Sequence, residues 1–223
     1  MFNWLLGRAE QKGPAIRDTL FGDMPLSEWQ GKSAQPIEPW ASFVRAKQRL
    51  DSEDKQGAIA AFRGVLEMPN LESRQYLQAW YFLREQGVFP LEEKAREVLG
   101  VVVEVGMNRG QDLVAAYPDH HARYYNFSGA GVVWERPNDV FDKAIDDLLR
   151  AASTAVQVIG PWEKDRPSPP SKGQARVNIL TPAGLHFGQG PLNVLSKDHI
   201  GGPVIGLAFQ LMQQMIKLAQ KRV

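Results

Sequence analysis

Cysteine is absent from the 223-residue sequence. The chain therefore cannot form disulfides, thiolate-ligated zinc sites or iron–sulfur clusters, and it has no cysteine nucleophile. The histidines do not follow the spacing of a zinc site either; they are His120, His121, His186 and His199. The first two are adjacent, and adjacent residues of a strand face opposite ways. We expect neither a metal nor a cofactor.

An excess of charge of one sign is also missing. Lys and Arg number 26 against 25 Asp and Glu, which leaves a formal net charge of +1. This balance provides no basic surface for nucleic acid or for an anionic membrane. No apolar run is long enough to span a bilayer, and the N-terminal residues lack the basic and apolar regions of a signal peptide. The sequence predicts a soluble cytoplasmic protein without nucleic-acid or membrane partners.

The common catalytic and phosphate-binding motifs are missing as well. There is no G-x-G-x-x-G, no G-K-S or G-K-T and no G-x-S-x-G, and the glycines of residues 128–131 suit a turn. An enzyme with an unfamiliar acidic site stays open, because Glu104 and Asp112 lie on neighbouring predicted strands and could meet. The alternative is that both face solvent and pair with Arg109 or Arg123.

The first hundred residues divide into an arm and a helical region. Residues 1–38 are rich in Gly, Pro and polar residues and predict an extended arm whose large apolar side chains dock on the body; these are Leu20, Phe21, Met24, Leu26 and Trp29. Residues 39–99 show the spacing of amphipathic helices. The predicted helices cover 40–50, 58–66, 71–83 and 91–99.

Small, aromatic and proline residues of the helical region resemble the tetratricopeptide repeat. Ala46, Ala58, Phe62 and Pro69 stand close to the small, small, aromatic and proline positions of that repeat. Ala79 lies 33 residues after Ala46, close to the period of about 34. The resemblance implies a groove between helices. The alternative is a pair of plain helical hairpins packed on the next domain.

From residue 100 the pattern changes to short β-branched runs separated by turns. Strands are predicted near 101–105, 112–117, 122–127, 132–135, 176–181 and 185–188, and helices over 139–159, with Asn138 as N-cap, and 203–222. The order β-β-β-β-α-β-β-α predicts an α+β domain over 100–223, with helices packed on an antiparallel sheet. This order resembles profilin-like and roadblock-like domains. Residues 161–173 hold four prolines and predict a surface linker.

Several short stretches of the α+β domain resemble a group of uncharacterised bacterial proteins. They are residues 122–129, 134–135, 180–185 and 187–188. The resemblance implies a bacterial origin and brings no activity with it.

Aromatic residues carry two functional hypotheses. The predicted helices carry four large aromatic residues, more than two short hairpins can bury, and these predict an interaction face. They are Trp40, Phe43, Trp80 and Phe82. The leading hypothesis is therefore a non-enzymatic protein-interaction or assembly protein that binds a protein partner or a second copy of itself. The alternative is a small-molecule-binding sensory domain, with a pocket between sheet and helix lined by Tyr124, Phe127 and Trp134.

Overall fold

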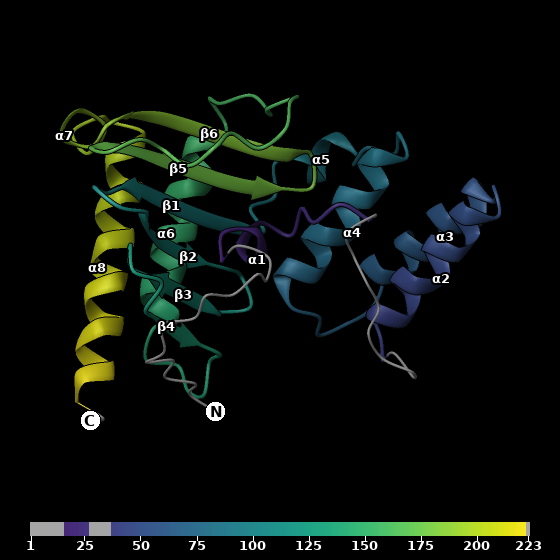
Figure 1. Cartoon of the computed structure of the whole chain (residues 1–223), viewed down its shortest axis with the longest axis horizontal. Helices are drawn as coiled ribbons and strands as arrows, with labels where there is room; N and C mark the ends of the chain where they lie inside the picture. The colour runs from purple at the N-terminus through teal and green to yellow at the C-terminus, as the bar shows by residue number, and fades with distance from the viewer. Residues whose placement is uncertain (1–15, 27–36, 222–223) are drawn as a thin grey trace.

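A six-stranded antiparallel sheet organises the chain, of which the computed structural model describes residues 16–26 and 37–221 (Figure 1). The strands are β1 (Gly100–Gly106), β2 (Gln111–Ala116), β3 (Ala122–Tyr125), β4 (Gly131–Trp134), β5 (Gln174–Thr181) and β6 (Gly184–Pro191). Their order in the sheet is β4-β3-β2-β1-β5-β6, and every pair is antiparallel. The predicted α+β class is confirmed.

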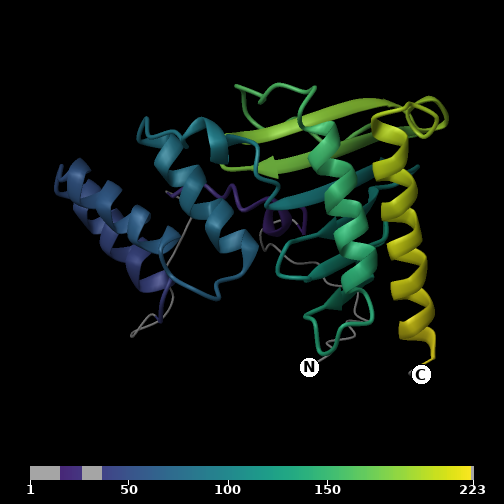
Figure 2. The same cartoon turned by 180° about the vertical axis from the view of Figure 1, so that it is seen from behind.

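Two long helices cover one face of the sheet, which we call the helix-covered face. Figure 2 shows α6 (Asp142–Ala155) and α8 (Gly201–Gln220) side by side on this face, and the one-turn α7 (Leu192–Leu195) connects β6 to α8. Apolar side chains of both helices pack on alternate residues of the strands, among them Val101, Val103 and Ile179. Burial of this kind stabilises by about 25 cal/mol per Å² of apolar surface.

The start of α6 differs from the prediction. Asn138 does not cap the helix, because the helix begins only at Asp142, and the Asn138 side chain accepts a hydrogen bond from the Val140 backbone N–H instead. Phe141, which precedes the helix, packs edge-on against Trp134 with ring centroids 4.4 Å apart. Residues 138–141 therefore form a turn that is fixed by this aromatic contact.

The opposite face is covered by the arm, and we call it the arm-covered face. The one-turn helix α1 (Asp18–Phe21) places Leu20 and Phe21 on the sheet, where they pack with Leu77 of α4 (Ser73–Glu85). The Tyr117 hydroxyl donates a hydrogen bond of 2.7 Å to the Leu20 carbonyl. Docking of the arm is confirmed for Leu20 and Phe21, whereas Trp29 lies outside the described residues.

The helical region consists of α2 (Trp40–Asp51), α3 (Lys55–Leu66), α4 and the one-turn α5 (Glu92–Ala95). In both views α2 and α3 lie farthest from the sheet, and α4 lies between them and the sheet (Figures 1 and 2). The helix predicted over 91–99 ends at Ala95. Further along the predicted helix, the Leu99 backbone N–H bonds to the Leu180 carbonyl of β5 at 2.8 Å.

None of the helices in residues 16–26 and 37–221 is sufficiently long and apolar to cross a membrane.

Candidate functional site

The aromatic residues predicted to form an interaction face belong mainly to the core of the helical region. Phe43 and Phe82 are fully buried and contact each other edge-on at 5.4 Å, so their assignment to a surface was wrong. Phe62 of α3 completes this cluster. The rings of α2, α3 and α4 thus cover one another. Trp40 is 37% exposed at the start of α2, and Trp80 packs half-buried against the same cluster.

The pocket predicted between sheet and helix is filled. Trp134 is fully buried on the helix-covered face, and Tyr124 packs half-buried against the same cluster. Phe127 is 52% exposed beyond the end of β3 and does not join them. Side chains of α6 and α8 occupy the space in which a ligand would have to lie, so these three residues do not line a shared cavity.

Glu104 and Asp112 face opposite sides of the sheet. Glu104 lies opposite Leu113 and Asp112 opposite Val105, and neighbouring pairs along antiparallel strands alternate between the two faces. The Asp112 carboxylate accepts a hydrogen bond from the Phe127 backbone N–H at 2.8 Å. The two carboxylates therefore form no acid–base pair, and the alternative, that both face solvent, is wrong for Glu104, which is fully buried.

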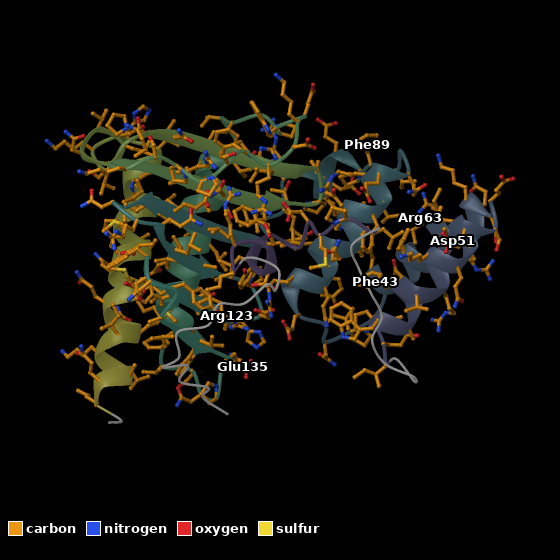
Figure 3. All side chains as sticks on the ribbon, viewed as in Figure 1. Phe43, Asp51, Arg63, Phe89, Arg123 and Glu135 are labelled. Atoms are coloured by element: carbon orange, nitrogen blue, oxygen red, sulfur yellow. The ribbon has the colours of Figure 1, made fainter. Side chains whose placement is uncertain are left out.

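A cleft of about 1050 Å³ opens between the arm, α4 and the linker that follows α6. Its walls come from five segments: residues 17–25, the end of α4, residues 89–95, residues 161–169, and the turn between β5 and β6. Phe89, which lies beside α5 in Figure 3, also lines this cleft and is 69% exposed. Trp162, 38% exposed, lines it from the linker. Apolar rings are thus accessible to a bound molecule.

A buried charge cluster joins the segments beneath the cleft. The Glu104 carboxylate receives hydrogen bonds from Arg17 Nε at 2.5 Å, from Arg176 Nη1 at 3.2 Å and from Asn178 Nδ2 at 3.1 Å. The two arginines also donate to backbone carbonyls of the linker, at Pro167 and Ser168. Burial lowers the pKa of Arg176, and the Glu104 charge opposes that shift. The cluster ties the arm and the linker to the sheet.

The linker is accordingly not exposed throughout. Residues 161–165 are exposed, whereas Arg166 and Pro167 are partly buried and Pro170 is buried. The surface linker predicted from the prolines therefore holds for residues 161–165, 168–169 and 171–173, and is wrong at Arg166, Pro167 and Pro170.

A second ion-pair group lies in the wall of the cleft. Arg166 bonds to Asp18 through Nη2 at 2.5 Å and to Asp23 through Nε at 2.7 Å, and its guanidinium stacks on Phe21 at 4.3 Å. Burial raises the pKa of Asp23, and Arg166 opposes that shift. Asp23 Oδ1 and Arg166 Nη1 are buried without a hydrogen-bond partner among the described residues. The wall thus has one hydrogen-bond acceptor and one donor that no described residue satisfies.

Arg84 lines the cleft without an ion pair to any carboxylate of the described residues. Its Nη1 donates to the Pro182 carbonyl at 2.7 Å and its guanidinium lies 5.9 Å from the Tyr81 ring centroid. Across residues 16–26 and 37–221, no carboxylate lies within ion-pair distance of it. Burial lowers the pKa of Arg84, and the charges of Tyr81, Asp23 and Glu85 oppose that shift. Burial also raises the pKa of Tyr81 to about 12 and that of Glu85. A partly desolvated guanidinium with no carboxylate in ion-pair contact favours an anionic group of a ligand.

The sequence contains no local signal for this cleft. Arg17, Arg84 and Arg166 belong to three segments, and each follows a pattern typical of a surface residue. No group of three or more His, Asp or Glu in the described part of the chain is arranged to hold a metal ion.

Fold and cleft together define an α+β protein with an open cleft of mixed charge. No protein-family model matches the chain, and no curated protein and no solved structure gives a significant match.

Proposed function

We propose that this chain is a non-enzymatic protein-interaction protein, and that its cleft binds a segment of a partner protein. The observation that carries the proposal is Arg84, a half-buried cation with no ion-pair partner among the described residues, in a cleft with exposed aromatic rings. The segment that suits this lining has an acidic side chain beside an apolar one. The carboxylate pairs with Arg84, and the apolar side chain packs on Phe89 and Trp162.

The dimensions of the cleft favour a segment of protein over a compact molecule. Pockets for small ligands typically measure roughly 300–1,000 Å³ and bury most of the ligand. The cleft has a volume of about 1050 Å³, and several of its lining residues are exposed, among them Phe89 and Glu163. An occupant here keeps part of its surface in solvent, as a peptide segment does.

Two carboxyl groups of the cleft wall are held in place by ion pairs. Asp18 and Asp23 both bond to Arg166, which fixes their positions in the wall. This arrangement supports a binding role.

Capture of partners from a lysate of the source cells tests the proposal, with Arg84→Gln and the wild-type chain as baits. Arg63→Gln is the matched control, because Arg63 is an exposed arginine on α3, away from the cleft (Figure 3). A partner held through a desolvated charge pair loses about 2–5 kcal/mol when the pair is broken. The partner is expected with the wild type and with Arg63→Gln, and to be lost with Arg84→Gln. Equal recovery by all three, at equal melting temperature, contradicts the proposal.

A second candidate, a small acidic ligand in the same cleft, is favoured by one observation. Asp23 Oδ1 and Arg166 Nη1 are buried without a hydrogen-bond partner among the described residues, and a ligand with a donor and an acceptor would use both. A thermal-shift screen of carboxylic acids, repeated with Arg84→Gln, tests it. An acid that raises the melting temperature of the wild type but not of Arg84→Gln supports the sensory role. If no acid raises the melting temperature of the wild type, the sensory role is contradicted.

A further inference from the structure

A second cavity, of about 640 Å³, opens beside the cleft, and we call it the side hollow. It lies between α5, the residues that follow α6 and the turn between β5 and β6. The cleft and the side hollow share three lining residues, Ala95, Pro161 and Ala183. All three have compact side chains and are at least partly exposed, so an extended segment in the cleft can continue over them into the side hollow.

Arg84 lies next to this junction. Its Nη1 donates a hydrogen bond of 2.7 Å to the Pro182 carbonyl. The following residue, Ala183, donates its backbone N–H to the Ala95 carbonyl at 3.2 Å. Arg84, the turn between β5 and β6 and the end of α5 are therefore contiguous. A carboxylate that pairs with Arg84 holds its segment at the entrance to the side hollow.

The lining of the side hollow is acidic. Glu92 and Glu93 of α5 and Glu97 beyond it contribute exposed carboxylates. Within residues 16–26 and 37–221, none of these three carboxylates forms an ion pair. Arg96 also lines the side hollow, and its Nη1 donates to the Gln157 carbonyl at 2.8 Å. The cleft thus offers a cation to an occupant, and the side hollow offers carboxylates.

A histidine of the side hollow lacks a hydrogen-bond donor as well. His186 lines the hollow and is fully buried, and its Nδ1 lies 2.8 Å from the Ile159 carbonyl. Because a carbonyl can only accept, Nδ1 carries the hydrogen, and Nε2 of the neutral ring is an acceptor. Nε2 has no partner among the described residues. The polar groups left over in the side hollow are therefore acceptors, which suits a cationic donor.

We propose that the segment bound in the cleft carries a Lys or Arg residue close to its acidic residue, and that this basic side chain enters the side hollow. The inference rests on the proposed function, because the cleft has to hold the segment. The acidic side chain pairs with Arg84 on one side of the junction, and the basic side chain pairs with the carboxylates of residues 92–97 on the other. Opposite charges at a fixed spacing define the class of partner segment and its register in the cleft.

Selection from a phage library of random peptides tests the proposal. The baits are the wild type, Arg84→Gln, the double variant Glu93→Lys/Glu97→Lys and the control Glu53→Lys/Glu67→Lys. The control exchanges two exposed glutamates that flank α3 and line neither the cleft nor the side hollow. The wild type and the control are expected to enrich peptides with an acidic and a basic residue at a fixed spacing. Arg84→Gln should lose the preference for the acidic residue, and Glu93→Lys/Glu97→Lys should prefer an acidic residue in place of the basic one.

The outcomes of the selection separate this inference from the proposed function. If the enriched peptides carry an acidic residue that depends on Arg84, but no basic residue that depends on Glu93 and Glu97, the inference is overturned and the proposed function stands. If the control loses the basic residue as well, net charge is the cause and the inference is overturned. If the wild type enriches no peptide, the proposed function and the inference are both contradicted.

Binding of one enriched peptide measures the pairing in the side hollow. Fluorescence anisotropy gives the Kd of this peptide and of a version in which Glu replaces its basic residue. On the wild type the replacement is expected to raise Kd at least about fivefold, because an attraction between exposed charges becomes a repulsion. On Glu93→Lys/Glu97→Lys the same replacement is expected to lower Kd. A Kd that changes by the same factor on both proteins overturns the proposal.

Discussion

The two faces of the sheet are covered by different chemistry. The helix-covered face is packed by apolar residues of α6 and α8, and its strand residues are mostly Val, Ile and Ala. The arm-covered face combines an apolar patch around Leu20 and Tyr117 with the buried cluster of Glu104, Arg17 and Arg176. Amphipathic helices of ordinary length cover the first face. The second is covered by short segments, and hydrogen bonds and charge fix the positions of these segments.

The difference shows what each kind of contact provides. Apolar packing on the helix-covered face stabilises in proportion to the area buried and tolerates similar side chains. A buried ion-pair cluster contributes little net stability but depends on each partner, because a partner left alone is a buried, unpaired charge. The arm-covered face is therefore the face on which a single substitution has the largest effect.

Glu104→Ala is expected to lower the free energy of unfolding by about 3–5 kcal/mol, because it leaves Arg17 and Arg176 buried without their carboxylate. Val103→Ala, at the adjacent residue that faces α6 and α8, should cost about 1–3 kcal/mol. Urea unfolding of both variants measures the difference.

Arg17→Ala is the control for Glu104→Ala. It should cost less, because Arg176 and Asn178 still hold the Glu104 carboxylate. The contrast between the faces fails if Glu104→Ala proves no more destabilising than Val103→Ala.

The helix-covered face could be predicted from the sequence, whereas the arm-covered face could be predicted only in part. The β-branched run of β1 and the apolar stripe of α8 are local patterns in the sequence, and both predictions are confirmed. Glu104 in a β-branched strand follows a pattern typical of a solvent-facing residue. Its burial depends on Arg17, 87 positions earlier, and on a linker carbonyl at Pro167, which no local pattern encodes.

The candidate site shows the same limit. Phe43 and Phe82 were predicted to contribute to an interaction face because two hairpins could not hide all four aromatic side chains, whereas rings of α2, α3 and α4 bury these two among themselves. The cleft could not be predicted, because the arm, α4 and the linker meet only through tertiary contacts.

The second-largest expected effect concerns pH and the helix-covered face. His186 is fully buried there; its Nδ1 lies 2.8 Å from the Ile159 carbonyl and its Nε2 has no partner among the described residues. Burial lowers the pKa of His186 below its usual 6.5. The unfolded chain then binds a proton more readily than the folded chain. Stability from the neutral ring is complete above pH 6.5 and is lost as the pH falls toward the depressed pKa.

His186→Asn isolates this effect, because the Asn amide can still donate to the Ile159 carbonyl but does not titrate. Thermal melts between pH 7.5 and 5 are expected to show a steeper loss of stability in the wild type than in the variant. Parallel curves would show that the helix-covered face accepts a protonated His186 ring without loss of stability. Exclusion of charge would then not distinguish this face from the arm-covered face.

The smallest effect is expected for an ion pair with the same chemistry as Glu104 but at the surface. Asp147 on α6 bonds to Lys143 and Arg150, each three or four residues away. These hydrogen bonds, that of Lys143 first, hold the pKa of Asp147 below its usual value. Water and salt screen such pairs, and their formation costs side-chain entropy. Asp147→Asn should therefore leave the urea midpoint at neutral pH unchanged within error, at low and at high salt. If it destabilised the chain as much as Glu104→Ala, burial could not be the cause of the large effect on the arm-covered face, and the number of partners around the carboxylate would have to explain it.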